Sequence, residues 1–280
     1  MAIELPVSDH HIELDEASFE RIAGILYKKS GITLNAGKHE LVKSRLVKRM
    51  RATGIQRFDE YLAFVEKDST GRELREMIDV LTTNKTSFFR EAQHFDFLRE
   101  TLLPKMRKSS NKIRIWSAGC STGEEPYTLG ILLREEIPEA GLTDVKILAT
   151  DLSDRVLAAA RKAEYTPDKL DDLPPGILKK YFKPVEDGEH GAWRVNDSVR
   201  KLVSLARLNL MEQWSMKGPF QAIFCRNVMI YFDKPTQERL IHRFGELLGR
   251  DGHLFVGHSE SLMASCNEFA YVRPAVYVKR

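Results

Sequence analysis

The chain has 280 residues, of which 42% are hydrophobic and 30% charged, as in an ordinary soluble globular protein. This length can form one large domain or two modest ones, and no apolar run approaches the roughly 20 residues that span a bilayer. The N-terminus lacks the basic start and apolar core of a signal peptide. The formal net charge of +3 is too small to indicate a nucleic-acid partner by itself.

The cysteines and histidines give no metal-ligand pattern. Cys120, Cys225 and Cys266 are far apart and form no C-x-x-C pair, which argues against a disulfide scaffold or a zinc site and favours a reducing cytoplasm. Structural roles are expected for the histidines His94, His242, His253 and His258.

Residues 15 to about 107 have helical patterns nearly throughout, which predicts a separate small helical domain. Four helices are expected, over residues 15–31, 38–53, 58–67 and 71–82. Asp15 is expected to cap the first helix and Gly31 to end it. The apolar stripe of the second is expected to comprise Leu41, Leu46, Val47 and Met50.

The second helix has an unusual charge. Between Lys38 and Arg57 there are seven basic residues and a single acid, Glu40. Such a run is either a solvated helix face or a docking surface for an acidic partner, protein or nucleic acid. Aromatic residues do not alternate with the basic ones, which makes base stacking on single strands less favourable.

A polar break follows at residues 82–91, read TTNKTSFFRE. In one interpretation, Thr86 or Ser87 caps a helix from about Arg90 to Arg107 and the two phenylalanines are core residues. In the other, Asn84, Thr86 and Arg90 form part of a ligand site, because such sites are common at domain junctions.

The stretch from Ile113 to Thr128, IRIWSAGCSTGEEPYT, predicts a buried strand, a turn of small residues and a helix with acids in its first turn. Small side chains allow a ligand to lie close to the backbone of the turn. Gly119 and Gly123 do not complete a G-x-G-x-x-G motif, so the spacing is weak evidence for a phosphate site.

Further strands are expected at residues 145–151, 202–210, 220–228, 253–258 and 271–279, the last as a pair of short strands around Pro274. They alternate with helices at 155–163 and 235–248, which predicts a mostly parallel, doubly wound sheet. Gly188 and Gly191 indicate a small hairpin or three-stranded insertion at about 183–201.

Ligand-binding side chains are expected on one rim of this sheet, because the carboxyl ends of its strands meet there. The candidates are Gly119, Glu125, Asp151, Asn209, Asn227 and Tyr231. Asp151 follows a strand, where a carboxylate accepts ribose hydroxyls. The turn has no P-loop lysine, and Glu124 and Glu125 would repel a pyrophosphate. A ligand with a cationic head and a ribose, such as S-adenosylmethionine, fits these side chains better than NAD or ATP.

The segments NKTSFFRE, WSAGCSTGEEPYTL, ATDLSDRVLAAAR, FCRNVMIYFD and LFVGHSES resemble the CheR family of chemotaxis receptor methyltransferases. The resemblance covers roughly residues 15–278. It implies a helical receptor-docking domain with its linker at residues 1–90. It also implies an α/β methyltransferase domain of Rossmann-like fold at 91–280, with a small antiparallel β insertion. Such enzymes transfer a methyl group from S-adenosylmethionine to glutamate side chains of chemoreceptors, leaving S-adenosylhomocysteine.

The resemblance also implies site residues. Cofactor contacts fall on Asn84, Thr86, Arg90, Ala118, Gly119, Glu125, Asp151, Leu152, Asn209, Leu210, Asn227 and Val228. Receptor docking falls on Lys43, Arg45, Lys48, Arg49 and Arg51. We expect Arg90 and Tyr231 to orient the substrate carboxylate, and Arg226 is an alternative to Arg90. No metal, no nucleic acid and no membrane insertion are expected, and the protein is expected to be a cytoplasmic monomer.

Two other interpretations stay open at this stage. One is a methyltransferase of nucleic acid or of a small molecule, with phosphates held by the basic helix. The other is a non-catalytic adaptor that keeps the cofactor pocket, although the presence of Asn84, Arg90, Asp151 and Tyr231 argues against loss of activity. The sequence does not decide whether the β insertion binds a receptor C-terminal peptide by strand pairing.

Overall fold

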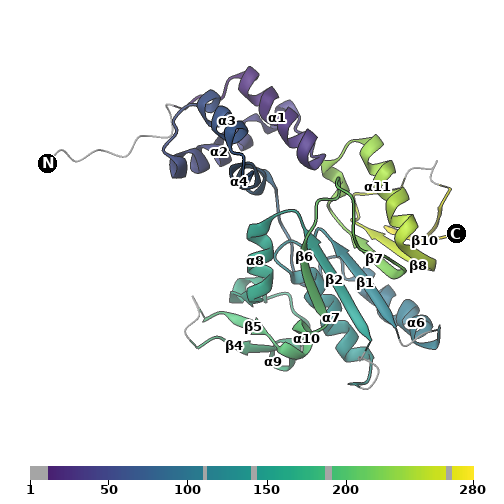
Figure 1. Ribbon diagram of the computed structural model, residues 1–280. Helices are drawn as coiled ribbons and strands as arrows, with labels where there is room; N and C mark the ends of the chain where they lie inside the picture. The colour runs from purple at the N-terminus through teal and green to yellow at the C-terminus, as the bar shows by residue number, and fades with distance from the viewer. Residues whose placement is uncertain (1–11, 110–111, 140–143, 187–190, 263–266) are drawn as a thin grey trace. The chain divides into compact units, whose positions relative to one another are not determined.

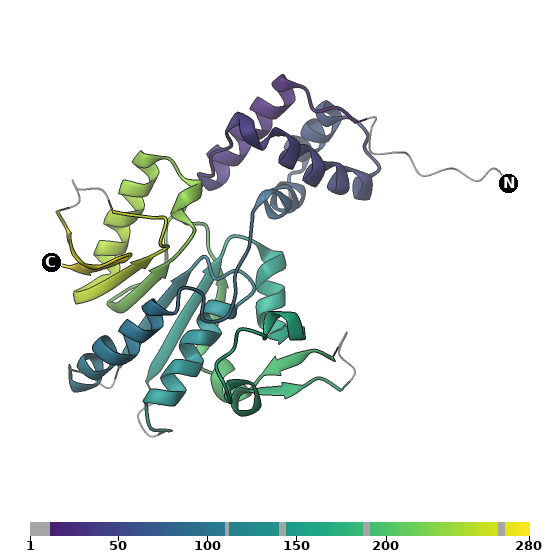
Figure 2. The same ribbon diagram turned by 180° about the vertical axis from the view of Figure 1, so that it is seen from behind.

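The computed structural model describes residues 12–109, 112–139, 144–186, 191–262 and 267–280 (Figures 1 and 2). The chain divides between Thr83 and Asn84 into two compact units. The sequence-based boundary after residue 90 lies a few residues beyond this division. Cys266 and Gly188 fall outside the described residues. Among the described residues, none of the helices combines the length and the apolar character that crossing a membrane requires.

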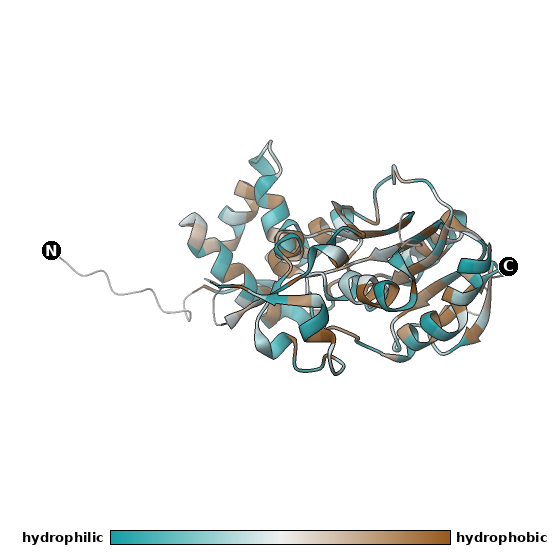
Figure 3. Ribbon diagram, turned by 90° about the horizontal axis from the view of Figure 1, so that it is seen from below, coloured by the Kyte–Doolittle hydropathy of each residue, from teal (hydrophilic) through white to brown (hydrophobic). Residues whose placement is uncertain are grey.

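The first unit consists of helices, as the sequence predicts: α1 (Glu16–Ser30), η2 (Ala36–Lys38), α2 (His39–Thr53), α3 (Phe58–Lys67) and α4 (Arg72–Leu81). Asp15 caps α1 by accepting a hydrogen bond from the Ser18 amide, and Gly31 ends it in the left-handed conformation with φ of 74°. Figure 3 shows apolar and polar residues interspersed along these helices, which pack their apolar sides together.

The apolar stripe of α2 differs in one position from the prediction. Val42, Leu46, Val47 and Met50 are buried, whereas Leu41 is half-buried. Val42 is fully enclosed at 0% exposure, so the buried face of α2 is rotated slightly toward this residue.

The predicted helix from Arg90 to Arg107 begins later and is not regular. It consists of α5 (Gln93–Phe97), the π-helical turn η3 (Leu98–Leu102) and α6 (Leu103–Ser109). The prediction that Thr86 or Ser87 caps it is wrong, because the helix starts after Ala92 without a side-chain cap. Phe89 and Glu91 have φ values of 52° and 56°, and this left-handed backbone excludes a helix across them.

The second unit contains a seven-stranded sheet in the order β6-β2-β1-β7-β8-β10-β9. Its strands are β1 (Ile113–Ala118), β2 (Val145–Asp151), β6 (Val203–Arg207), β7 (Phe220–Cys225), β8 (Leu248–Val256), β9 (Phe269–Arg273) and β10 (Val276–Lys279). The first five strands in this order pair in parallel, and β10 runs antiparallel to both of its neighbours. The predicted mostly parallel sheet is confirmed.

Helices cover both faces of this sheet (Figures 1 and 2). They are α7 (Glu124–Glu136), α8 (Asp154–Lys162), α10 (Asp197–Arg200) and α11 (Lys234–Leu247). Ile115 of β1 packs with α5, α6 and α7 on one face, whereas Trp116 packs with Leu240 and Phe244 of α11 on the other. Alternating residues of one strand therefore belong to two separate cores.

The predicted insertion is a three-stranded antiparallel sheet in the order β3-β5-β4. Its strands are β3 (Glu164–Tyr165), β4 (Phe182–Pro184) and β5 (Trp193–Val195), and the short helices η5 (Pro167–Lys169) and α9 (Ile177–Tyr181) lie between β3 and β4. The small sheet thus starts at Glu164, earlier than residue 183, at which the sequence pattern places the start of the insertion. Phe182 and Tyr165 pack against Phe88, which fixes this sheet to the segment before α5.

Candidate functional site

The turn between β1 and α7 is held by hydrogen bonds from its backbone amides to the end of β2. The amides of Gly119 and Cys120 donate to the Thr150 carbonyl at 2.8 and 2.9 Å. The Ser121 amide donates to Oδ2 of Asp151 at 2.8 Å. These donors are the ones that a phosphate would require. The weak phosphate interpretation of the glycine spacing therefore has no support from the geometry of this turn.

Gly119 is required at its position for two reasons. Its φ is +86°, which L side chains rarely adopt, and an added Cβ would lie 2.4 Å from Cγ2 of Val228. Val228 belongs to the segment after β7, and β7 pairs in parallel with β1. Gly119 thus allows the turn after β1 and the segment after β7 to meet at one edge of the sheet.

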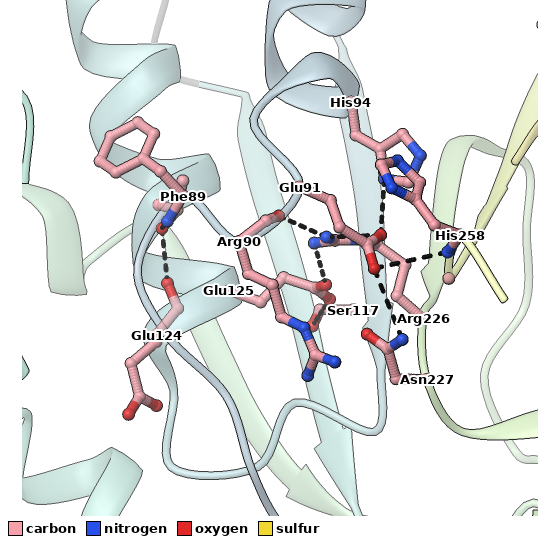
Figure 4. Close-up of polar contacts among 12 residues, drawn as sticks. Phe89, Arg90, Glu91, His94, Ser117, Glu124, Glu125, Arg226, Asn227 and His258 are labelled. Atoms are coloured by element: carbon pink, nitrogen blue, oxygen red, sulfur yellow. Dashed lines mark hydrogen bonds and ion pairs between the residues drawn. The ribbon is translucent and has the colours of Figure 1, made fainter. Parts of the chain in front are cut away.

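Buried charges lie at this edge, in a cluster of Glu91, Glu125 and Arg226 that we call the charge clamp (Figure 4). The Arg226 side chain is 2% exposed and donates through Nη1 to Glu125 at 2.9 Å and through Nη2 to Glu91 at 3.0 Å. Oε1 of Glu125 also accepts a hydrogen bond from the Ser117 hydroxyl at 2.6 Å. One guanidinium is thus shared by two carboxylates.

The two carboxylates of the charge clamp have different acidities. Burial acts to raise the pKa of Glu91, but the attraction of Arg226 outweighs it and holds this pKa below its ordinary value. Burial raises the pKa of Glu125 above its ordinary value, against the attraction of the same guanidinium. A cationic ligand group beside Glu125 would offset the cost of burying the ionised carboxylate, because it would add a positive charge next to it.

The segment after β7 is fixed by another buried acid, Glu260. Its carboxylate accepts hydrogen bonds from the backbone amides of Asn227 at 2.9 Å and Ile230 at 3.0 Å, and also from Gly257. Asn227 has a φ of 58°, a left-handed conformation that asparagine tolerates. Three amides on one carboxylate hold the Asn227 backbone in this conformation.

The remaining candidates lie on neighbouring segments. Asp151 ends β2, and its Oδ1 accepts the Ser153 amide at 3.0 Å. Asn209 follows β6, is buried and accepts the Met211 amide at 3.0 Å. Tyr231 lies in η7 (Met229–Tyr231) and is half-buried. Because β1, β2, β6 and β7 are parallel, their carboxyl ends bring these residues to one edge of the sheet.

The segment before α5 lies over this edge. The Asn84 carbonyl accepts a hydrogen bond from the Ser121 hydroxyl at 2.8 Å, which ties the segment to the turn after β1. Arg90 is half-buried, and its Nη1 donates to the Lys85 carbonyl at 2.8 Å. Figure 4 places the Arg90 side chain on the same side as Glu125, whereas Arg226 is enclosed by its partners. Of the two arginines, Arg90 is therefore the accessible one.

Three potential metal ligands lie together beside the charge clamp. One ligand atom each of Glu91, His94 and His258 lie within 4.8 Å of one another. Sequence spacing did not indicate this group, because His258 is far from the other two along the chain. Burial lowers the pKa of His94 to about 3, so its ring is neutral at physiological pH. Any cation here would compete with Arg226 for the carboxylate of Glu91.

The basic residues of α2 fall into two groups. Arg45 donates to the Leu81 and Thr82 carbonyls at the end of α4, at 2.8 and 3.1 Å. Arg49 donates a bidentate pair of hydrogen bonds to the buried carboxylate of Glu73. These two arginines hold the helical unit together. Lys48 and Arg51 are exposed and Lys43 is half-buried.

Sequence reasoning did not single out Glu91, Glu260 or Ser117. Glu91 and Glu260 belong to the motifs FFRE and GHSES, which served only to establish the resemblance. Their partners are distant in the chain, Glu91 from Arg226 by 135 positions and Glu260 from Asn227 by 33. The sequence indicates such a pair only weakly, by an acid in one motif and a possible partner in another motif far along the chain.

The order of the sheet and its helices define an α/β domain of the Rossmann-like methyltransferase type. The family model described as "CheR methyltransferase, SAM binding domain" matches residues 84–278. The model described as "CheR methyltransferase, all-alpha domain" matches residues 17–82. The chain belongs to the CheR family of chemotaxis methyltransferases, as the sequence resemblance predicted.

Curated relatives match nearly the whole chain. The chemotaxis protein methyltransferase of Klebsiella aerogenes is 42% identical, over 99% of this chain and 92% of its own. The chemotaxis protein methyltransferases of Borreliella burgdorferi and Escherichia coli are each 40% identical. They cover 96% and 95% of this chain, and 96% and 92% of their own lengths.

Proposed function

We propose that this protein transfers a methyl group from S-adenosylmethionine to glutamate side chains on the cytoplasmic helices of chemoreceptors. The observation that carries the proposal is the charge clamp, in which two largely enclosed carboxylates share one guanidinium. Together with the occupied amides of the turn after β1, this arrangement favours a ligand with a cationic head over a phosphorylated one. The site thus fits the amino acid end of S-adenosylmethionine.

Each part of the cofactor has a matching group. Glu125 would accept the cationic amino group, and Asp151, at the end of β2, would accept the ribose hydroxyls. The backbone around Gly119 and Ala118, at the end of β1, would lie beneath the cofactor. Further contacts are assigned to Asn84, Thr86, Leu152, Asn209, Leu210, Asn227 and Val228.

The chemistry requires positioning and little proton transfer. A glutamate with a pKa of about 4.3 is ionised at neutral pH, so no strong general base is needed. The cofactor supplies the methyl group on a positively charged sulfur, which leaves as a neutral thioether when the new carbon–oxygen bond forms. The protein must hold a carboxylate oxygen in line with this methyl group and exclude water. No metal is needed, because the leaving group already carries the charge.

We assign the orientation of the substrate carboxylate to Arg90 and Tyr231. Arg90 is half-buried and keeps donors that the Lys85 carbonyl does not occupy. Arg226 is no longer an alternative in this role, because its donors are directed at Glu91, Glu125 and the Arg90 carbonyl.

Receptor docking is assigned to Lys43, Lys48 and Arg51 of α2. Arg45 and Arg49, which the sequence also suggested, are no longer included because they bind within the helical unit. The small β sheet offers β4 as an edge strand, to which a receptor C-terminal peptide can pair. We also propose that the enzyme acts in the cytoplasm, as a monomer and without a nucleic-acid partner. An adaptor without activity is disfavoured by the complete set of candidate residues at the sheet edge.

The proposal is tested by transfer of a labelled methyl group to purified receptor cytoplasmic fragments. Arg90→Ala and Tyr231→Phe should lower the transfer rate while their far-UV spectra stay native. Tyr271→Phe is the matched control, because Tyr271 is 65% exposed on β9, and it should leave the rate unchanged. Unchanged turnover in both site variants would contradict the assignment. Calorimetry with S-adenosylhomocysteine separates a binder from a protein that has lost its cofactor site.

A further inference from the structure

Arg226 is enclosed by acceptors from two different segments, α7 and the segment before α5. Its Nη1 donates to Glu125 of α7 at 2.9 Å, and its Nε and Nη2 donate to Glu91 at 3.3 and 3.0 Å. Nη2 also donates to the backbone carbonyl of Arg90. The guanidinium carbon lies 5.4 Å from the centre of the Phe95 ring. Because it has these partners and is 2% exposed, the Arg226 side chain makes its hydrogen bonds within the protein.

Glu91 connects Arg226 to further segments. Its second oxygen, Oε1, accepts hydrogen bonds from Nδ2 of Asn227 at 3.5 Å and from the His258 amide at 3.4 Å. Figure 4 shows these contacts converging on one carboxylate. Glu91 itself has a φ of 56°, an unfavourable conformation for glutamate, which its surroundings must stabilise. One side chain therefore joins the segment before α5, the segment after β7 and the end of β8.

We propose that Glu91 is a positioning residue for methyl transfer, which acts through Arg226. Glu91 and Glu125 hold the guanidinium between them, and the guanidinium holds the Arg90 carbonyl. The backbone that carries the Arg90 side chain is thereby fixed against the segment that carries Asn227. This inference rests on the proposed function, because it concerns how that reaction is oriented.

The geometry explains why a carboxylate is needed at position 91. A glutamine of the same length would keep one acceptor oxygen but would point an amide group at either Arg226 or the Asn227 amide. Arg226 would lose one of its two counter-charges, and Glu125 would become its only acid. The guanidinium would then shift toward Glu125, and the Arg90 carbonyl would lose its donor.

A double-mutant cycle on methyl transfer tests this inference, with Glu91→Gln, Arg226→Gln and the double variant. Because misplacement by about 1 Å can cost about 100-fold in rate, each single variant should lower kcat by about 10- to 100-fold. If Glu91 acts through Arg226, the kcat of the double variant should be no lower than that of the less active single variant. The KM for the receptor fragment should not change, because docking is assigned to the helical unit.

Two measurements separate positioning from loss of folded protein. Calorimetric titration with S-adenosylhomocysteine gives the fraction of binding-competent chain, and this stoichiometry should equal that of the wild type. Glu100→Gln is the matched control, because Glu100 is exposed and forms a surface ion pair with Arg99, and it should retain full activity. If Glu91→Gln does not fold at the assay temperature, Glu91→Asp takes its place in the cycle.

The outcomes are distinct. Losses that multiply in the double variant, or a binding stoichiometry that falls in step with kcat, would overturn the positioning role of Glu91. Failure of the proposed function looks different, because the wild type itself would then transfer no methyl group to receptor fragments.

Discussion

Replacement of Gly119 by alanine tests how the turn after β1 and the segment after β7 meet. Two costs are expected. A φ of +86° is strained for alanine, which costs about 1–2 kcal/mol. The added Cβ also lies 2.4 Å from Cγ2 of Val228, and overpacking of this kind costs about 1–3 kcal/mol. The free energy of unfolding should therefore fall by about 2–5 kcal/mol.

Gly176 provides the matched control for the backbone cost. Its φ is +82°, and an added Cβ would have no atom within 4 Å. Gly176→Ala should therefore lose only the strain, about 1–2 kcal/mol. The difference between the two variants isolates the contact with Val228.

Urea unfolding, followed by circular dichroism, measures both variants. Combination of Gly119→Ala with Val228→Ala should recover about 1–3 kcal/mol relative to the sum of the single losses, because the clashing methyl group is removed. The same double variant should also bind S-adenosylhomocysteine better than Gly119→Ala alone. If Gly119→Ala destabilises the protein no more than Gly176→Ala does, the close approach of Val228 does not constrain this turn.

Three further predictions concern charged and titrating groups. Arg49→Ala should reduce the free energy of unfolding by about 2–3 kcal/mol, because it leaves the buried carboxylate of Glu73 without its cation. Lys48→Ala should change the free energy of unfolding little and should instead raise the KM for receptor fragments. Equal stabilities of the Arg49→Ala and Lys48→Ala variants would contradict the division of the basic residues of α2 into two groups. His94 has a folded-state pKa of about 3 against about 6.5 when unfolded, so stability should fall as the pH drops below about 6.5, by about 1.4 kcal/mol at pH ~5.5. His94→Phe should reduce this pH dependence, as measured by urea unfolding at several pH values, and an unchanged dependence would refute it. Because burial raises the pKa of Glu125, affinity for S-adenosylhomocysteine should fall as the pH is lowered from neutral, whereas Glu125→Gln should bind weakly with no such dependence in calorimetry.

Much of the fold follows from local sequence signals. The bounds of α3 and β2 agree with the predicted ranges, because Phe58–Lys67 has a clear helical period and Val145–Asp151 is a mostly apolar stretch ending in an acid. Asp15 caps α1 as expected, and Ser153 caps α8 by the same local chemistry. These features depend only on residues within a few positions of one another.

The wrong and incomplete predictions depend on distant contacts. The late start of α5 follows from the left-handed backbone at Phe89 and Glu91, which is stabilised by partners such as Thr128 and Arg226. β3 has only two residues, too few for a periodic pattern, and it forms because β5 pairs with it. A single sequence gives no direct sign of such pairings.

The candidate site was predictable in its location but less so in its arrangement. Parallel strands place Gly119, Asp151 and Asn227 on one edge, and this follows from sequence order alone. That Arg226 is shared by Glu91 and Glu125 depends on a contact 135 positions apart. The sequence therefore offered Arg226 as an alternative to Arg90, whereas the structure encloses its side chain at 2% exposure.

The central proposal is tested most directly by the chemical identity of the methylated product. The wild-type protein, S-adenosylmethionine with a labelled methyl group and a receptor cytoplasmic fragment are incubated, and the fragment is analysed by peptide mass spectrometry. We predict a label that maps to glutamate residues and is released by mild base, as expected of methyl esters. A base-stable label, or label on nucleic acid and none on the receptor, would contradict the proposal.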